Sequence, residues 1–509
     1  MVTPKPDPSD PVVLTLDVGS SSVRAILFDQ QANPIDGIDA HHSYEFQTTA
    51  DGGVEIDADA LLGWAIDVID TVLARAGQML PFKKGSSKYG SRIARVATST
   101  FWHNLVGVDS HHQAVTPVYS WADTRSVAVV EELKKKLDEK EVHARTGCVL
   151  HPSYLPAKLF WLQQTQPQTF RKAKRWMSFG EYLYLKLFGR TICSISMASG
   201  TGLLDQNHCE WDSELISTLS LSTDHLSSLG DLDTPLSGLT SDYAQRWPDL
   251  SKVPWFPALG DGACSNIGSG CSTRERVAIM VGTSGAMRVL WKAQQVRIPP
   301  GLWCYHADRQ RFLMGGALSN GGLLYDWMSR TLRMDNDAEG IERQLAEMEP
   351  DAHGLTVLPF LAGERSTGWN ANARAAIVGL SLHTRPLDIL RASLESVAYR
   401  FAKIAALLKE AVPGAREIVA SGGALLRSPT WTQMMADVLG QPVIACQVAE
   451  ASSRGAALLA MEALGIIRSI EEIPTSMGKK FHPDPQRHHR YQEAMKRQDE
   501  VYNLLIRPK

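Results

Sequence analysis

A turn rich in glycine and hydroxyl residues occurs twice in this chain, once near its start and once just past its middle. The first copy, Asp17-Val-Gly-Ser-Ser-Ser22, follows an apolar stretch that begins at Leu14. The second copy, Gly282-Thr-Ser-Gly285, follows the apolar stretch Val277–Val281. Turns of this kind direct several backbone N–H groups and hydroxyls at one point, as a phosphate requires. Two related turns therefore predict two hairpins that hold a polyphosphate between two related domains.

The two turns differ at a position that bears on metal binding. Asp17 in the first copy corresponds to Met280 in the second. A single carboxylate suits one divalent cation, because Mg²⁺ usually takes only one or two carboxylates together with phosphate oxygens and water. The chain is therefore predicted to use ATP and Mg²⁺, with Asp17 at the metal. The phosphate contacts are expected from Gly19, Ser20, Ser21, Ser22, Gly282 and Thr283.

A further chemical candidate is Asp261, which lies between Gly260 and Gly262 at the predicted start of a helix of small residues. Asp is a preferred N-cap residue, where its side chain accepts hydrogen bonds from backbone N–H groups. A carboxylate that faces a cleft can instead act as a general base and accept the proton of an attacking hydroxyl. From the residues alone, both roles stay open.

Two other glycine turns suit a nucleoside. The stretch Val419–Ser421 reads as a strand that ends at Gly422-Gly-Ala424, and a helix is predicted from Pro429. Glycines let a flat ring lie against the backbone, which favours adenine and ribose beside Gly422, Gly423 and Ala424. The turn around Gly321 is expected to cover the other side of the nucleotide. A plain strand-to-helix turn is the alternative for both segments.

Polar and aromatic residues on two loops of the first half suit a polyhydroxylated ligand. One loop carries Trp102 and His103, and the other carries Asp123 and Arg125. Together they offer an apolar wall and charged hydrogen-bonding groups, so all four are predicted substrate contacts. Each has a structural alternative: Arg125 can pair with Asp123 on the surface, and His103 can be a packed core histidine.

Strand-like and helix-like segments alternate through both halves, which is typical of an α/β layered fold. In the first half the pattern predicts hairpin strands at 14–16 and 23–28, a helix at 57–75, a strand at 92–98 and a charged helix at 129–141. In the second half it predicts a hairpin at 277–290, a helix from Pro386 to Lys409 and a strand at 417–420. Each chemical candidate thus falls at the end of a strand or in a connecting loop.

The length of 509 residues is too great for one core, so two large domains are expected. Prolines at 254 and 257 indicate a boundary in the middle of the chain. The predicted divisions are a flexible arm at 1–11, a first domain at 12–256, a second domain at 257–480 and a helical tail at 481–509.

Composition narrows the class of partner. Lys and Arg number 52 against 55 for Asp and Glu, so the net charge is −3 and favours neither nucleic acid nor an anionic membrane. No apolar run approaches the roughly 18 residues that a membrane helix needs. The seven cysteines are scattered and show no C-x-x-C spacing, which predicts reduced thiols and a cytoplasmic location.

Several segments resemble the FGGY carbohydrate kinases of the actin/sugar-kinase/Hsp70 ATPase superfamily over nearly the whole chain. The resemblance is carried by Ala375-Ala-Ile-Val-Gly-Leu380 followed by Asp388–Glu395, by Pro359–Ser366 and by Ser421–Ala424. It implies an α/β fold with two actin-like (ribonuclease H-like) ATPase domains that flank a catalytic cleft. It also implies that the first domain binds the sugar, that the second binds ATP, and that Asp261 is the catalytic base.

Within the family, Met197–Asp205 and Trp121–Arg125 look most like gluconate kinases, so D-gluconate is the expected small-molecule substrate. Its carboxylate would need a cationic partner, for which Arg125 and His103 are the candidates. Two positions depart from the family pattern: Trp102 stands where Met is usual, and Gly262 stands where many relatives carry Asn or Gln. Xylulose, ribulose and glycerol remain alternative substrates, and an actin- or Hsp70-like switch or a sugar sensor remains an alternative class. The oligomeric state stays open, a homodimer included.

Overall fold

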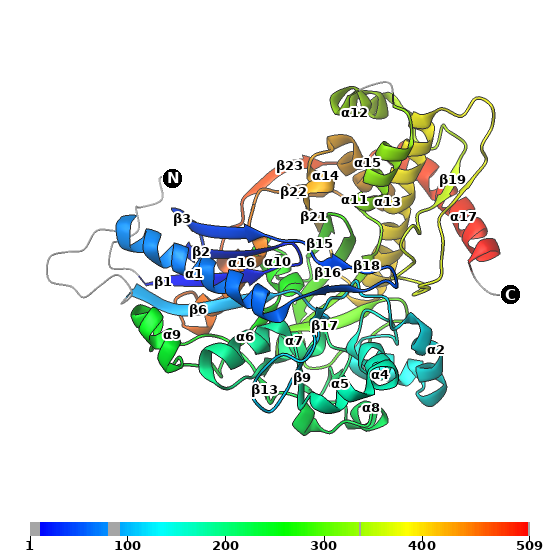
Figure 1. The fold of residues 1–509 in the computed structure, drawn as a ribbon. Coiled ribbons are helices and arrows are strands. Elements are labelled where there is room, and N and C mark those ends of the chain that lie inside the picture. Colours follow the sequence, from blue (N-terminus) through cyan, green and yellow to red (C-terminus); the bar gives the residue numbers. More distant parts are fainter. Residues whose placement is uncertain (1–10, 80–91, 335–336, 507–509) are drawn as a thin grey trace.

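Two mixed sheets form the framework of the computed structural model, which describes residues 11–79, 92–334 and 337–506 (Figure 1). The first sheet has the order β14-β6-β1-β2-β3 and the second has the order β17-β18-β16-β15-β21-β22-β23. The strands of the first sheet are β1 (Val12–Val18), β2 (Ser22–Phe28), β3 (Pro34–Ser43), β6 (Ile93–Thr100) and β14 (Leu259–Gly260). Those of the second are β15 (Arg276–Val281), β16 (Gly285–Lys292), β17 (Trp303–Asp308), β18 (Arg311–Leu318), β21 (Glu417–Ser421), β22 (Val443–Cys446) and β23 (Met477–Phe481).

The two sheets share one connection scheme. In the first, β1, β2 and β3 are antiparallel neighbours, while β6 and β14 add to β1 in parallel. In the second, β15, β16 and β18 are antiparallel neighbours, while β21 and β22 add to β15 in parallel. The repeated hairpin in the sequence is therefore part of a repeated sheet, and the expected pair of actin-like domains is confirmed.

Helices cover the outer face of each sheet. Helix α1 (Ala58–Met79) packs against β2 and β3 through apolar residues such as Leu61, Ala65 and Ile69. On the second sheet, α13 (Pro386–Ala411) buries Leu394 and Phe401 against β16 and β18. The other helices on this side are α11 (Gly322–Thr331), α12 (Ala338–Glu347), α14 (Gly423–Leu426), α15 (Pro429–Leu439) and α17 (Pro485–Leu505). Figure 1 shows α1 and α17 at opposite ends of the molecule.

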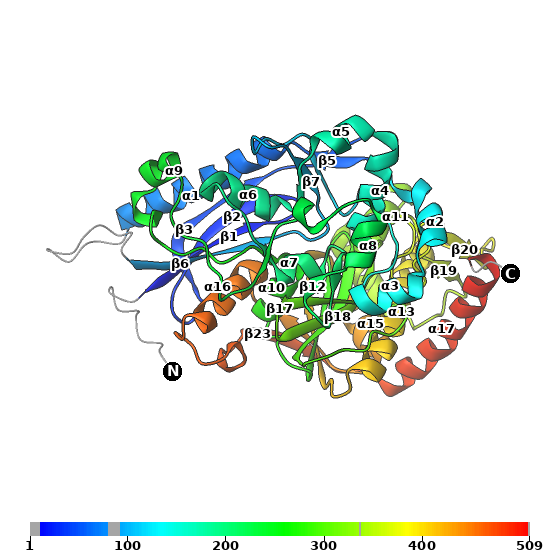
Figure 2. The same cartoon turned by 90° about the horizontal axis from the view of Figure 1, so that it is seen from below.

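Two helices lie between the sheets and position the cleft. Helix α10 (Asp261–Gly268) packs closely on α16 (Ala451–Ala463), and α16 also contacts β1 and β6 (Figure 2). The contact is close because both helices carry glycine: a Cβ atom at Gly268 or Gly455 would lie 1.8 Å from a backbone oxygen of the other helix. This pair fixes Asp261 at the junction of the two halves.

A largely helical region connects β6 to β14. Its helices are α2 (Val127–Lys136), α3 (Glu139–Thr146), α4 (Leu155–Thr165), α5 (Pro167–Lys172), α6 (Phe179–Phe188), α7 (Ile195–Ser199), α8 (Ser213–Thr218) and α9 (Ser241–Arg246). The small strands are β4 (Gln47–Thr48), β5 (Val54–Ile56), β7 (Val106–Val108), β8 (Val118–Tyr119), β9 (Arg175–Met177), β10 (Cys193–Ser194), β11 (Leu204–Asp205), β12 (Glu210–Trp211), β13 (Leu229–Gly230), β19 (Thr356–Leu358) and β20 (Ala376–Val378). Within this region α7 packs against β17 of the second sheet, so the connection joins the two halves.

Two sequence-based boundaries change in the structure. The single charged helix predicted at 129–141 is wrong, because the Asp138 side chain accepts hydrogen bonds from the N–H groups of Lys140 and Glu141 and starts a second helix there. The first sheet also extends past the boundary predicted after residue 256, since β14 pairs with β6. The predicted arm at 1–11 lies almost wholly outside the described residues. The predicted tail contains α17, while Phe481 at its start still belongs to β23.

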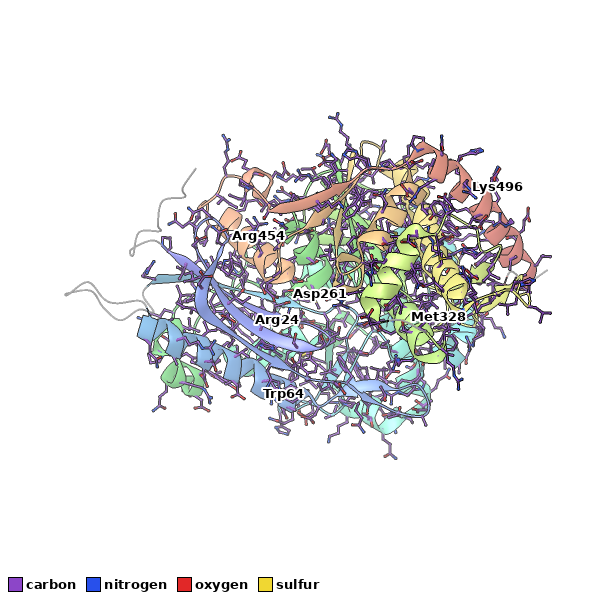
Figure 3. The ribbon with its side chains drawn as sticks, turned by 90° about the horizontal axis from the view of Figure 1, so that it is seen from above. Arg24, Trp64, Asp261, Met328, Arg454 and Lys496 are labelled. Atoms are coloured by element: carbon purple, nitrogen blue, oxygen red, sulfur yellow. The ribbon has the colours of Figure 1, made fainter. Side chains whose placement is uncertain are left out.

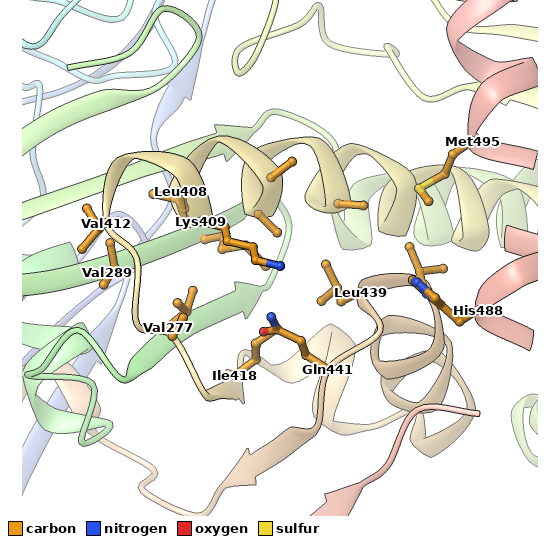
Figure 4. A pocket seen from close by; sticks show the side chains of 16 residues that line it. Val277, Val289, Leu408, Lys409, Val412, Ile418, Leu439, Gln441, His488 and Met495 are labelled. Atoms are coloured by element: carbon orange, nitrogen blue, oxygen red, sulfur yellow. The ribbon is translucent and has the colours of Figure 1, made fainter. Parts of the chain in front are cut away.

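An apolar cavity of about 220 Å³ lies in the second half, far from the hairpin turn (Figure 4). It is lined at the amino ends of β15 and β21 by Val277 and Ile418, and on α13 by Ala402, Ala405 and Ala406. The seven cysteines are all buried and none forms a disulfide. None of the helices within the described ranges is long and apolar enough to cross a membrane.

Candidate active site

A cavity of about 230 Å³ is lined by residues of both hairpin turns. Ser20 comes from the turn between β1 and β2, and Ser284 comes from the turn between β15 and β16. Asp261 and Gly262 at the start of α10 and Ser452 of α16 complete this end of the cavity. Figure 3 shows Asp261 near the middle of the molecule, between the two halves. The sequence repeat thus brings both turns and the candidate base to one site.

Asp261 is the first residue of α10, and Gly260 occupies the N-cap position. The Asp261 Oδ1 atom accepts a hydrogen bond from the Gly262 N–H at 2.7 Å, so the carboxylate interacts with the first helical turn as well as facing the cavity. A Cβ atom at residue 260 would lie 1.9 Å from the Trp102 ring, which explains the glycine there. Burial raises the pKa of Asp261, while the neighbouring Arg288 charge opposes the rise.

Asp17 lies at the end of β1 and is buried. Its Oδ1 atom has no hydrogen-bond partner among the described residues. Burial, together with repulsion from Asp261, raises the pKa of Asp17 to about 7. An unpartnered buried carboxylate oxygen next to a second carboxylate fits a divalent cation, whose charge would stabilise both ionised groups.

The segments predicted to hold the nucleotide meet at the second hairpin turn. The Gly321 N–H donates to the Thr283 carbonyl at 3.0 Å, and the Gly322 N–H donates to the Gly282 carbonyl at 2.7 Å. Gly422 has a φ of +89°, and a Cβ atom there would lie 2.4 Å from the Val281 carbonyl oxygen. Gly282, Thr283, Gly321 and the turn Gly422-Gly423-Ala424 are therefore packed together. On the other side, the Gly19 N–H donates to the Ser22 carbonyl at 2.9 Å, and Ser20 and Ser21 are exposed.

Aromatic rings form the wall beyond Asp261. Trp102, Trp303 and Tyr305 line the cavity, with the rings of Trp303 and Tyr305 stacked 4.2 Å apart. His103 also lines it, and its Nδ1 is hydrogen-bonded to the Gly200 carbonyl. Burial, with the charge of Arg365 as the next cause, lowers the pKa of His103 to about 3. The expectation that His103 supplies a positive charge to a carboxylate is therefore wrong, because the ring is neutral at physiological pH.

Asp123 and Arg125 do not line this cavity. The Arg125 Nη2 lies 2.5 Å from carboxylate oxygens of Glu55 and Asp123, and its guanidinium lies 4.9 Å from the centre of the Trp161 ring. Asp123 also accepts a hydrogen bond from the Val54 N–H at 3.2 Å. The structural alternative for this pair holds, in a half-buried form: the two residues stabilise the loop behind the cavity wall.

The sequence analysis missed four residues that line the cavity: Arg288, Trp303, Tyr305 and Arg365. Arg288 comes from β16, and Arg365 comes from the loop between β19 and β20. Arg365 lies in the segment Pro359–Ser366 that carried the family resemblance, so this motif was an available signal. Trp303 and Tyr305 had none, because they reach the cavity only where β17 packs on the first half.

Comparison with known families agrees with this geometry. Residues 12–268 match the N-terminal domain of the FGGY family of carbohydrate kinases, and residues 277–464 match its C-terminal domain. The chain belongs to this family. An FGGY carbohydrate kinase is a phosphotransferase with an alcohol group as acceptor, so this chain is an enzyme that uses ATP and a small-molecule sugar. Kinases of the family generally require a divalent metal.

Individual relatives of this FGGY kinase carry different substrate names. The chain is 27% identical to the gluconokinase of Bacillus subtilis, over 93% of this chain and 91% of that one. It is 29% identical to the glycerol kinase of Leptothrix cholodnii, over 92% and 95% of the two chains. Among solved structures, the gluconate kinase from Lactobacillus acidophilus superposes with a TM-score of 0.87 at 26% identity, covering 97% of this chain and 98% of that one. These likenesses leave several sugars as candidate substrates.

Proposed function

We propose that this FGGY kinase transfers the γ-phosphoryl group of Mg·ATP to a terminal hydroxyl of a small open-chain sugar acid, with D-gluconate as the first candidate. The observation that carries the proposal is the carboxylate of Asp261, which lines a cavity that both hairpin turns also line. The gluconokinase and gluconate kinase relatives favour D-gluconate among the sugars of the family.

In this proposal Asp261 orients the attacking hydroxyl and accepts its proton. Its raised pKa suits the role, because a base that titrates nearer neutral pH transfers protons more effectively. The Arg288 charge keeps the carboxylate ionised at working pH. Positioning and charge neutralisation supply most of the rate acceleration in phosphoryl transfer.

The other residues bind and orient the second substrate. Asp17 would hold the divalent cation, and bound Mg·ATP would supply the phosphoryl group and neutralise its charge. The turns Gly19–Ser22 and Gly282–Thr283 would bind the phosphates through backbone N–H groups and hydroxyls. Gly321 and the turn Gly422–Ala424 would border the nucleoside. The ring of Trp102 would limit the access of water, which otherwise competes as acceptor.

The proposal is tested by ADP release from Mg·ATP in the presence of D-gluconate, D-xylulose, D-ribulose or glycerol. We expect D-gluconate to give the largest stimulation. Asp261→Asn should lower kcat by roughly 10²- to 10⁴-fold, the usual contribution of a general base, and should leave ADP affinity unchanged. Asp242→Asn on the exposed surface of α9 is the matched control and should behave as wild type.

Near-normal turnover of the Asp261→Asn enzyme would remove Asp261 from the role of base. Strong stimulation by glycerol or a ketose but not by D-gluconate would reject the sugar acid and keep the kinase. Hydrolysis of ATP that no sugar stimulates would reject both.

A further inference from the structure

The wall of the active-site cavity contains more hydrogen-bond donors than the protein itself satisfies. Nε of Arg288, Nε of Arg365 and Nε1 of Trp303 are buried and have no hydrogen-bond partner among the described residues. All three residues line the cavity. A buried donor without a partner is costly, and most such groups are paired in folded proteins. The three donors therefore indicate a ligand that is rich in acceptor oxygens.

The two arginines act at different ends of the cavity. The Arg288 Nη1 atom donates to the Gly262 carbonyl at 2.7 Å, and the charge of Arg288 acts on Asp261. The charge of Arg365 acts instead on His103 and His151, where it is, after burial, the largest cause of their lowered pKa. Arg288 thus belongs to the end that carries the base, and Arg365 belongs to the end formed by His103.

Arg365 has no acidic partner within the described part of the chain. Its guanidinium lies over the Trp121 ring, with Cζ 5.7 Å from the ring centre, and Trp121 also lines the cavity. Stacking of this kind fixes the plane of the group and leaves its N–H edge available. A positive charge held in this way at a cavity wall suits an anionic group of a ligand.

The other positive groups nearby are already engaged. Arg125 is paired with Glu55 and Asp123, as described above. The Lys158 ammonium donates to the carbonyl oxygens of Pro152 and Asp123, and burial lowers its pKa to about 7. His103 is neutral at physiological pH. Of the cations considered at this end, Arg365 is the one that faces the cavity without a counter-charge.

We propose that Arg365 binds the carboxylate of the sugar acid, at the end of the open-chain substrate remote from the hydroxyl that Asp261 deprotonates. The inference rests on the proposed function, because it assigns the specificity of the same site. A planar guanidinium can hold a carboxylate through two parallel N–H···O bonds, which a neutral sugar cannot form. Since Arg365 comes from the second half and His103 from the first, the substrate would be held by both halves.

The test compares D-gluconate with D-glucitol, which carries CH₂OH in place of the carboxylate, on full-length wild type and Arg365→Met. We expect Arg365→Met to raise the KM for D-gluconate by roughly 30- to 100-fold, the loss typical of a charge-assisted pair. The kcat for D-gluconate should change by less than about 3-fold, because the hydroxyl end is intact. The KM for ATP and any rate with D-glucitol should not change.

Two variants control for a purely structural effect. Arg365→Lys keeps the charge and loses the fork, so its KM for D-gluconate should lie between those of wild type and Arg365→Met. Arg374→Met changes an exposed arginine in the same loop and should behave as wild type. An unchanged KM for D-gluconate in Arg365→Met would overturn the proposal. A rise in the KM for ATP instead would also overturn it, because it would place the arginine at the phosphates.

Calorimetric titration of D-gluconate into the nucleotide-free protein separates failure of this inference from failure of the proposed function. Binding that is lost in Arg365→Met, without phosphorylation by wild type, would keep the carboxylate site and reject the proposed reaction. Phosphorylation and binding that are equal in both proteins would keep the reaction and reject the role of Arg365. A wild type that neither binds nor phosphorylates D-gluconate would reject both.

Discussion

Asp17 and Asp261 place two carboxylates in one buried region, and this arrangement opposes folding at neutral pH. The folded-state pKa of Asp17 is about 7, compared with an ordinary value of 3.8. Between these pH values the folded protein binds more protons at Asp17 than the unfolded chain does. The free energy of unfolding of the metal-free protein should therefore fall as pH rises from about 4 to about 7. A cation bound at Asp17 would remove this loss.

Asp17→Asn should consequently stabilise the metal-free protein while it impairs catalysis. In the presence of EDTA at pH 8, we expect the midpoint of thermal unfolding to rise by a few degrees, equivalent to roughly 1–3 kcal/mol. The difference from wild type should shrink at pH 5, where the Asp17 carboxyl of wild type is largely protonated. Thermal unfolding at both pH values measures this effect, with Asp242→Asn as control. Equal destabilisation at both pH values would contradict the assignment of strain to the buried charge.

Trp102 and Gly262 explain one another. Each departs from the pattern expected in the family, and the two departures occupy the same space. A Cβ atom at residue 262 would lie 2.7 Å from the Trp102 ring and 2.5 Å from the guanidinium of Arg288. The larger aromatic residue therefore requires glycine at 262. Arg288 lies where the side chain of a larger residue 262 would begin.

At the scale of elements, α13 contains a feature that its amphipathic pattern does not reveal. Its alanines 402, 405 and 406 leave the apolar cavity shown in Figure 4 open against Val277 and Ile418. Empty apolar space forfeits contacts, and filling such space is a common route to higher stability. Because the cavity lies at the amino ends of β15 and β21, changes there should not reach the hairpin turn at their carboxyl ends.

Ala405→Leu should raise the free energy of unfolding by about 1 kcal/mol and leave kcat and KM unchanged. Chemical denaturation and steady-state kinetics measure the two expectations. Ala398→Leu is the matched control on the same helix. Ala398 is fully buried and does not line the cavity, so its enlargement should destabilise the protein by about 1–3 kcal/mol. If both variants lost stability equally, the space beside Ala405 would not be open.

Local patterns predicted the elements that depend on neighbours in the chain. The two hairpins and α13 follow from apolar spacing and from turn residues, and the structure has them where the sequence indicated. The helix at 129–141 failed because the capping side chain of Asp138 outweighed continuous helix propensity. Its signature was present, since an Asp that precedes charged residues is a typical start of a helix.

At the scale of the whole molecule, the site depends on how the two halves meet, and single-chain patterns carry little information about that. Strand β17 is joined to the first half by three hydrogen bonds: the Cys304 N–H to the Gly147 carbonyl at 3.1 Å, the His306 N–H to the Ser199 Oγ at 2.9 Å, and Tyr154 to Tyr305 at 2.7 Å. These contacts bring Trp303 and Tyr305 into the cavity. Residues contributed in this way cannot be recognised until the junction is known.

The burial of every cysteine makes the chain a natural reporter of its own opening. Burial raises the pKa of all seven thiols, so each is both covered and protonated in the native state. Alkylating reagents attack thiolates, and hence should modify only molecules that have opened. We expect negligible labelling of the native enzyme and complete labelling in denaturant, measured by mass spectrometry; rapid native labelling would contradict this expectation.

Two of these thiols, Cys148 and Cys304, lie on the two sides of the junction, while Cys271 and Cys446 lie in a small core beside the second sheet. The order in which peptides containing them become alkylated would therefore show which opens first, the junction between the halves or the second sheet. Substrates that hold the halves together should slow modification of the first pair more than of the second. The chain thus carries its own chemical clock for separation of the halves, without an added label.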